Sequence, residues 1–184
     1  MADSTGRRIL LCVGNPDRGD DAIGRRVGVL LGSLATFERV ECDGEATRIL
    51  AALEGARAAI IVDASFSGAP PGTVRRFDLD SEPAPLCADV GWSSHGFGLA
   101  EAIGLGRALG GLPPVCVLFA IEGESFAPGA PLSAGAEAGA AEAARLILAE
   151  FSPDRRSGGP SLSTGGEIAG PESAGPCPKD RKTL

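Results

Sequence analysis

The sequence lacks any long apolar run. The longest one near its start covers residues 9–13, which is much shorter than a signal-peptide core or a membrane span. It also lacks a stripe of lysine and arginine with interleaved aromatic residues, and its formal net charge is -7. We therefore expect a cytoplasmic protein that does not enter the membrane and does not bind nucleic acid. We also expect a monomer, which these features do not themselves determine.

The five cysteines form no familiar metal or disulfide motif. They lie tens of residues apart, no CxxC pair occurs and their total is odd, so neither a zinc knuckle nor a disulfide framework is indicated. These residues are Cys12, Cys42, Cys87, Cys116 and Cys177. We expect most of them to be buried thiols in a reducing compartment.

Buried strands alternate with helical segments along most of the chain. The patterns predict strands at residues 9–13, 37–42, 59–62 and 115–121, and helices at about 21–34, around 49–53, and at about 95–109 and 133–151. A strand at residues 73–79 follows a turn too short for a crossover helix, so we expect it to run antiparallel at a sheet edge. This order predicts an α/β fold, a three-layer αβα sandwich with a mostly parallel twisted central sheet.

The composition changes after residue 151. From Ser152 onward the chain is rich in proline, glycine, serine and charged residues, with hardly any large apolar side chain. The chain has 184 residues and 43% hydrophobic content, enough to bury one core. We predict one domain over residues 1–151 and a disordered tail over residues 152–184.

A glycine loop over residues 14–24 joins the first strand to the first helix. Gly14 and Gly19 have the GxxxxG spacing of a phosphate-binding loop, but Asp20 and Asp21 stand where Lys and Ser or Thr are needed. Two carboxylates at a helix start repel a phosphate, and GxGxxG is absent from this turn, so a nucleotide-binding module is disfavoured. We expect Asp20 to cap the helix, which leaves Asp21 as the freer carboxylate.

A second carboxylate and the only histidine complete a candidate metal site. Asp63 ends the buried strand 59–62, where it either opens the next turn or faces a cleft. If the first and third strands are adjacent, Asp21 and Asp63 lie together where the parallel strands end, which we call the carboxyl edge of the sheet. His95 starts a helix, where a cap or surface role is the alternative. Two carboxylates and an imidazole suit a divalent metal such as Ni²⁺ or Zn²⁺, with open positions left.

Other catalytic motifs are absent or weak. The chain has neither HExxH nor GxSxG, and Ser93 and Ser94 adjoin His95 in sequence, where a nucleophile–base pair seldom forms. Phe66, Trp92 and Phe97 flank the predicted site in the sequence and could grip a substrate. Core packing is the alternative, which we favour for Phe97.

Three motifs in register resemble those of the hydrogenase maturation proteases. They are Gly14-Asn15 with Asp20-Asp21-Ala22-Ile23-Gly24, then Ile60-Ile61-Val62-Asp63-Ala64, then Ser94-His95-Gly96-Phe97-Gly98-Leu99. The resemblance covers about residues 8–151. It implies a twisted sheet flanked by helices, with Asp21, Asp63 and His95 as a catalytic, metal-binding triad.

The resemblance also implies a function. Proteases of this family test whether nickel has been placed in the large subunit of a [NiFe]-hydrogenase, and then cut a C-terminal extension from that precursor. We therefore expect an aspartyl-type endopeptidase whose partner is the large-subunit precursor and whose nickel is carried by the substrate. A non-catalytic nickel-sensing or chaperone module with the same ligands is the alternative. The general base, for which Asp17 and Asp20 are candidates, stays unassigned.

Overall fold

The computed structural model describes residues 6–32, 37–79 and 96–151. The chain divides into two units, Met1–Pro153 and Asp154–Leu184. The tail predicted over residues 152–184 lies outside the described residues. None of the helices within the described ranges combines the length and the apolar composition that a membrane span needs.

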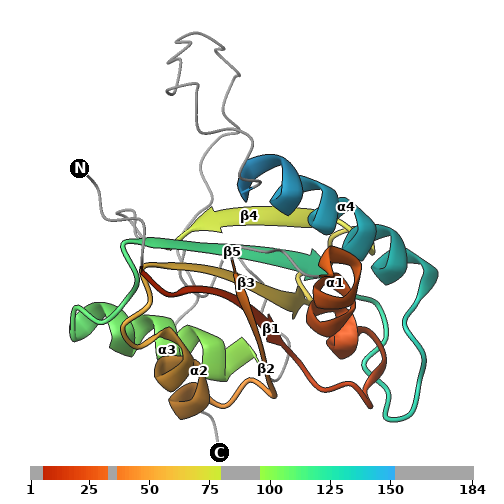
Figure 1. The fold of residues 1–184 in the computed structure, drawn as a ribbon. Helices are drawn as coiled ribbons and strands as arrows, with labels where there is room; N and C mark the ends of the chain where they lie inside the picture. The colour runs from red at the N-terminus through yellow and green to blue at the C-terminus, as the bar shows by residue number, and fades with distance from the viewer. Residues whose placement is uncertain (1–5, 33–36, 80–95, 152–184) are drawn as a thin grey trace, which may run out of the picture. The chain divides into compact units, whose positions relative to one another are not determined.

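A five-stranded sheet with the order β2-β1-β3-β5-β4 forms the centre of the first unit (Figure 1). Its strands are β1 (Arg8–Val13), β2 (Glu38–Cys42), β3 (Ala58–Ser65), β4 (Val74–Asp78) and β5 (Val115–Glu122). All neighbours pair in parallel except β4, which is antiparallel to β5 at the edge. The predicted antiparallel edge strand is confirmed, and the first and third strands are adjacent, which was the condition for Asp21 and Asp63 to share an edge.

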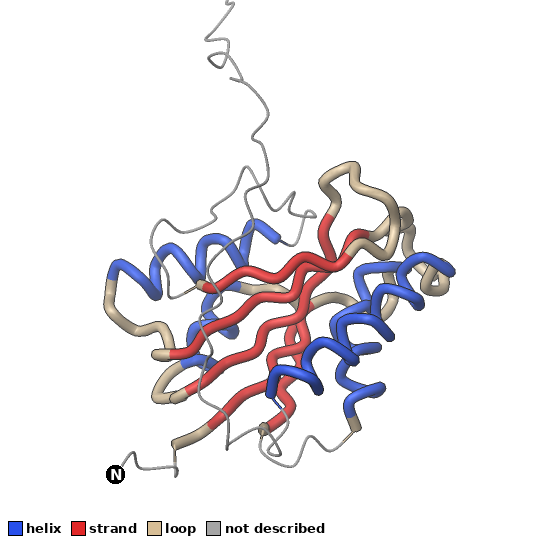
Figure 2. The backbone as a smooth tube through the Cα atoms, turned by 90° about the horizontal axis from the view of Figure 1, so that it is seen from above, coloured by secondary structure: helices blue, strands red, loops and turns tan. Residues whose placement is uncertain are grey.

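Helices cover both faces of the sheet (Figure 2). On one face lie α1 (Ile23–Leu31), which follows a short 3-10 helix η1 (Gly19–Ala22), and α4 (Ala134–Phe151). On the other face lie α2 (Ala46–Leu53) and α3 (Gly96–Ala108). The predicted three-layer αβα sandwich is therefore confirmed.

Alternate residues of each inner strand contribute to two separate hydrophobic cores. In β1, Ile9, Leu11 and Val13 face α2 and α3. Leu10 and Cys12 face α1 and α4 instead. Successive side chains of a strand point to opposite faces, so a strand covered on both sides must be apolar throughout.

The described cysteines are buried thiols. They are Cys12, Cys42 and Cys116. Burial raises the pKa of the Cys12 thiol to about 12, so this thiol stays protonated at neutral pH. Cys87 and Cys177 lie outside the described residues.

Two predictions at the carboxyl edge of the sheet were wrong. Asp20 does not cap the first helix, because it lies inside η1, whose N-cap is Arg18. β3 does not stop at Asp63 but continues to Ser65, which pairs with Glu122 of β5. β5 pairs with β3 as far as Glu122, its own last residue, so Asp63 lies within the strand and does not open a turn.

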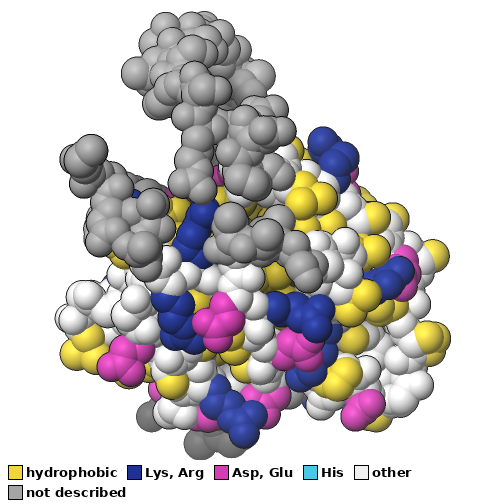
Figure 3. Space-filling view, in the orientation of Figure 1, with side chains coloured by type: hydrophobic (Ala, Val, Ile, Leu, Met, Phe, Trp, Pro, Cys, Tyr) yellow, Lys and Arg dark blue, Asp and Glu magenta, His cyan; other side chains and the backbone are white. Residues whose placement is uncertain are grey.

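Charged side chains of both signs are mixed on the surface. On the face shown in Figure 3, arginine side chains lie among aspartate and glutamate side chains. Arg7 pairs with Glu38 at 2.9 Å and Arg76 with Glu150 at 2.7 Å. Among the described side chains of that face there is no large patch of one sign.

Candidate active site

Both predicted carboxylates lie at the carboxyl edge of the parallel strands. Asp21 belongs to η1, which follows β1, and Asp63 lies near the end of β3. β1 and β3 are paired neighbours, with Cys12 beside Val62, so the segments that follow them start side by side. Asp21 and Asp63 are only 0% and 1% exposed. The fold therefore brings two buried carboxyls from distant parts of the chain to one edge.

Asp63 has one oxygen that is hydrogen-bonded and one that is not. Its Oδ1 accepts a hydrogen bond from the backbone N–H of Ala64 at 2.8 Å. Its Oδ2 is buried without a hydrogen-bond partner among the described residues. Burial, and then the nearby charge of Asp21, raise the pKa of Asp63 to about 7. An orphaned carboxylate oxygen beside a second carboxylate fits the needs of a divalent cation.

The glycine loop holds the carboxylate of Asp21. The backbone N–H of Asn15 donates to Asp21 Oδ2 at 3.0 Å. Gly14 has a φ of +123°, and a Cβ at this position would lie 1.8 Å from the carbonyl oxygen of Asp21. Only glycine combines this backbone conformation with so close an approach. The Gly14-Asn15 pair therefore positions a carboxylate and not a phosphate.

Gly24 brings the start of α1 directly against the end of β1 and the second half of β3. A Cβ at Gly24 would lie 2.4 Å from the carbonyl oxygen of Val13 and 2.7 Å from that of Val62. Both neighbours are backbone atoms of inner strands, which cannot rotate away as a side chain can. This contact sets how closely η1 and Asp21 approach β3.

Replacing Gly24 by alanine should lower the free energy of unfolding by about 3 kcal/mol, because the added methyl group collides with two strands. The control is Gly104→Ala in α3, where a Cβ meets no atom within 4 Å. Alanine favours a helix, so that variant should be neutral or more stable by about 0.5–1 kcal/mol. Urea unfolding followed by circular dichroism measures both, and equal stabilities would contradict the close approach at Gly24.

The first turn of α3 lies at the same edge. A Cβ at Gly98 would lie 1.9 Å from the carbonyl oxygen of Gly44, in the turn that follows β2. His95, the predicted third ligand, precedes α3 directly in sequence and lies outside the described residues, as does Trp92. The described residues taken alone contain no group of three His, Cys, Asp or Glu side chains placed to hold a metal.

Asp20 has a different role from its neighbour Asp21. Its buried carboxylate accepts hydrogen bonds from the N–H groups of Glu124, Ser125 and Ser133 at 2.8, 3.1 and 2.7 Å, and from the Ser133 hydroxyl at 2.9 Å. Burial raises the pKa of Asp20, but these hydrogen bonds outweigh it and lower the pKa overall. Asp20 thus fastens η1 to the connection between β5 and α4, and its lone pairs are engaged.

Glu122 is a second anchor, to which the sequence patterns assigned no role. It is 1% exposed at the end of β5. It accepts hydrogen bonds from the hydroxyls of Ser65 and Ser67 at 2.8 and 2.9 Å, and from the N–H groups of Ser67 and Gly68 at 2.5 and 2.8 Å. Arg75 adds an ion pair at 3.7 Å. In the sequence, Glu122 is marked only as an acidic residue at the end of an apolar run. Asp63 also follows an apolar run but has a different hydrogen-bond environment, so this pattern does not distinguish the two residues.

Known proteins share this fold. The hydrogenase maturating endopeptidase HybD from E. coli is 24% identical, with a TM-score of 0.64 over 81% of this chain and 94% of that one. The [NiFe] hydrogenase maturation protease HybD from Thermococcus kodakarensis is 21% identical, with a TM-score of 0.61 over 78% and 98%. A hydrogenase 2 maturation peptidase from a Thaumarchaeota archaeon is 26% identical, with a TM-score of 0.56 over 79% and 98%. The comparison with curated proteins gave no match.

The sequence itself matches a family. Residues 44–150, more than half of the chain, match the model of the family described as hydrogenase maturation protease. The matched region includes Asp63 and Glu122 and begins after Asp21, which the pairing of β1 with β3 brings to the same edge of the sheet as Asp63. The family resemblance inferred from three motifs is confirmed. The chain belongs to the hydrogenase maturation protease family and is a peptidase.

Proposed function

We propose that this peptidase removes a C-terminal extension from the nickel-loaded large-subunit precursor of a [NiFe]-hydrogenase. The observation that carries the proposal is the pair of buried carboxyls at the carboxyl edge, Asp21 and Asp63. Membership of the hydrogenase maturation proteases supports a hydrogenase precursor as the substrate. One protein of the same fold is described as a [NiFe] hydrogenase maturation protease, which supports a [NiFe]-hydrogenase as the source of the precursor.

Asp21, Asp63 and His95 are the residues that we propose as ligands and as the catalytic set of an aspartyl-type endopeptidase. The donor set fits a divalent ion, because two buried carboxylates favour a cation and Asp63 offers an oxygen that no described residue bonds. Nickel bound there would supply a Lewis acid at the substrate. Three protein ligands leave coordination positions open, which favours an ion already held by the precursor and makes nickel part of the substrate.

The protonation of Asp63 determines whether the proposed set of ligands can bind a metal ion. Asp63 is largely neutral below its pKa of about 7, and it must lose its proton to act as a ligand. Asp20 and Glu122 are engaged in hydrogen bonds that hold the surrounding segments. Asp17 is exposed on the same loop as Asp20 and is a candidate for the general base.

We further propose that the protein acts in the cytoplasm as a monomer. The buried thiols of Cys12, Cys42 and Cys116 are compatible with a reducing compartment. A single copy carries both described carboxyls of the site, so the proposed chemistry needs no second copy for them.

The purified full-length protein should shorten a nickel-loaded precursor and process the nickel-free precursor at least about tenfold more slowly, a difference of about 1.4 kcal/mol in recognition. A denaturing gel and the mass of the released peptide measure the cut. His95→Ala should fold normally and lose processing if His95 is a ligand. Equal cleavage of both precursors would reject nickel recognition, and cleavage of neither would reject this substrate.

The same experiment tests the alternative of a non-catalytic nickel-sensing or chaperone module. That module binds nickel without cutting any precursor. Isothermal titration of the protein with nickel, beside the cleavage assay, distinguishes the two functions.

A further inference from the structure

Two loops without charged residues border the candidate active site. They cover residues 65–72, from the last residue of β3 onward, and residues 125–133, which follow the exposed Glu124 after β5, and we call these two uncharged segments together the neutral rim. The loops start side by side, because Ser65 pairs with Glu122 and the N–H of Gly123 donates to the carbonyl oxygen of Ser65 at 2.9 Å. Charged residues make up 22% of the chain, so a charge-free surface built from two loops is unusual for this protein.

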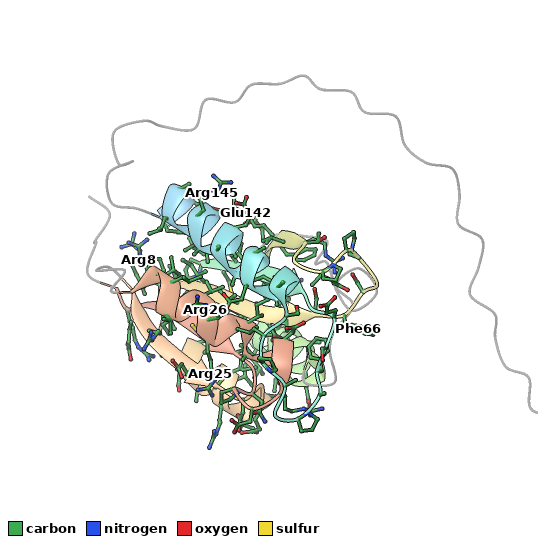
Figure 4. The ribbon with its side chains drawn as sticks, turned by 90° about the vertical axis from the view of Figure 1, so that its right-hand side faces the viewer. Arg8, Arg25, Arg26, Phe66, Glu142 and Arg145 are labelled. Carbon is green, nitrogen blue, oxygen red and sulfur yellow. The ribbon has the colours of Figure 1, made fainter. Side chains whose placement is uncertain are left out.

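Phe66 is the most prominent apolar side chain of the neutral rim. It is 58% exposed, and its ring lies edge-on against that of Phe126, with centroids 5.8 Å apart and an interplanar angle of 82°. In Figure 4 it lies at the opposite end of the sheet from Arg8, which starts β1. Asp63 is three residues away along the chain, so the two Cα atoms are at most about 11 Å apart. Phe66 is therefore close to the candidate active site and available to a ligand.

Hydrogen bonds to the buried carboxylate of Glu122 hold Phe66 in this exposed position. Glu122 accepts bonds from the hydroxyl of Ser65 on one side of Phe66 and from the N–H and hydroxyl of Ser67 on the other. A segment fixed on both sides loses little conformational freedom when a ligand binds. Aromatic side chains that are exposed and held rigidly are frequent anchors at binding surfaces.

We infer that Phe66 is a specificity-determining residue that binds an apolar side chain of the precursor near the scissile bond. The inference rests on the proposed function. A charged substrate side chain would lose hydration on the neutral rim, whose own residues carry no charge, and only Glu124 beside it could pair with a cation, so an uncharged extended segment fits best. Strand pairing is disfavoured as the mode of contact, because prolines lack the backbone N–H that a ladder needs. The prolines of the neutral rim are Pro70, Pro71, Pro128 and Pro131.

The test is steady-state processing of purified nickel-loaded precursor by the full chain. Phe66→Ala should raise KM by about five- to tenfold, because the contact between the exposed half of the phenylalanine side chain and its apolar partner is lost. It should change kcat by less than about twofold. Phe66→Leu should recover part of the loss. The matched control is Val29→Ala in α1, because Val29 is also 58% exposed and lies on another part of the surface.

Three outcomes decide the inference. An unchanged KM for Phe66→Ala with intact cleavage overturns it, and so does an equal rise in KM for Val29→Ala.

If the wild type does not cut, the proposed function fails, and the binding of precursor to wild type and variant is compared by biolayer interferometry. Weaker binding by Phe66→Ala then supports the contact, and equal binding removes it. Should Phe66→Ala melt at a lower temperature, Phe66→Leu takes its place in the same comparison.

Discussion

Asp63→Asn should abolish precursor processing and at the same time stabilise the metal-free protein at pH 8. We expect cleavage to fall by at least about 10³-fold, because a neutral amide would replace the proposed anionic ligand, at a loss of several kcal/mol of charge stabilisation. The amide is nearly the same size as the carboxyl, and its oxygen can still accept the hydrogen bond from the N–H of Ala64. Loss of activity would therefore not come from loss of fold.

The stability gain follows from the raised pKa of Asp63. Its pKa is 3.8 ordinarily and about 7 in the folded protein, because the carboxyl is buried and lies near the charge of Asp21. Below pH 3.8 the folded and unfolded states both hold the proton. As pH rises toward about 7 the unfolded state releases the proton first, so the folded protein loses stability across this window. Asparagine does not titrate, so the gain should reach on the order of 4 kcal/mol above the window.

Urea unfolding of the metal-free proteins at pH 5 and pH 8, with a chelator present, measures this difference. The control is Glu142→Gln on α4, where Glu142 forms an exposed pair with Arg145 (Figure 4). An exposed pair contributes little, so this variant should match the wild type in both stability and cleavage. An Asp63→Asn variant that processes precursor normally would refute the ligand role. A gain that is the same at both pH values would refute the raised pKa.

Asp20→Ala should destabilise the protein by about 3–5 kcal/mol, because the donors that now meet a buried carboxylate lose their acceptor. Asp20→Asn should cost less, about 1–2 kcal/mol. Oδ2 accepts the bonds from Glu124, Ser125 and the Ser133 hydroxyl, so an amide oxygen in that place retains them. The amide NH₂ then faces the N–H of Ser133, which is the contact that is lost.

Thermal unfolding and amide hydrogen exchange measure this effect. Exchange at the N–H groups of Glu124, Ser125 and Ser133 should accelerate in Asp20→Ala before global unfolding, because these groups lose their protection locally. Asp17→Ala, an exposed position on the same loop, is the control and should stay within about 0.5 kcal/mol of the wild type. Equal stability of the two variants would show that the carboxylate of Asp20 does not anchor the connection between β5 and α4.

Local patterns were sufficient to predict the fold. Strands covered on both faces are continuous apolar runs and helices repeat their apolar residues every three to four positions, so the alternation of the two predicted the αβα sandwich. The common edge of Asp21 and Asp63 followed from the parallel topology, in which strands end on the same side. Element boundaries were less accurate: β3 runs on through Asp63 to Ser65, because its pairing with β5 continues there.

The separate roles of the buried carboxylates depended on tertiary structure. Asp20 resembles a helix cap in sequence, but its hydrogen-bond donors lie 104 to 113 residues further along the chain. Asp63 and Glu122 each follow an apolar run, yet serine hydroxyls and backbone N–H groups surround Glu122, whereas Asp63 keeps an oxygen that no described residue bonds. The sequence by itself determined which residue types reach this edge of the sheet. Whether a buried carboxylate serves as an anchor or keeps an oxygen that could accept a cation depends on how many donors meet it, and only long-range packing decided that number.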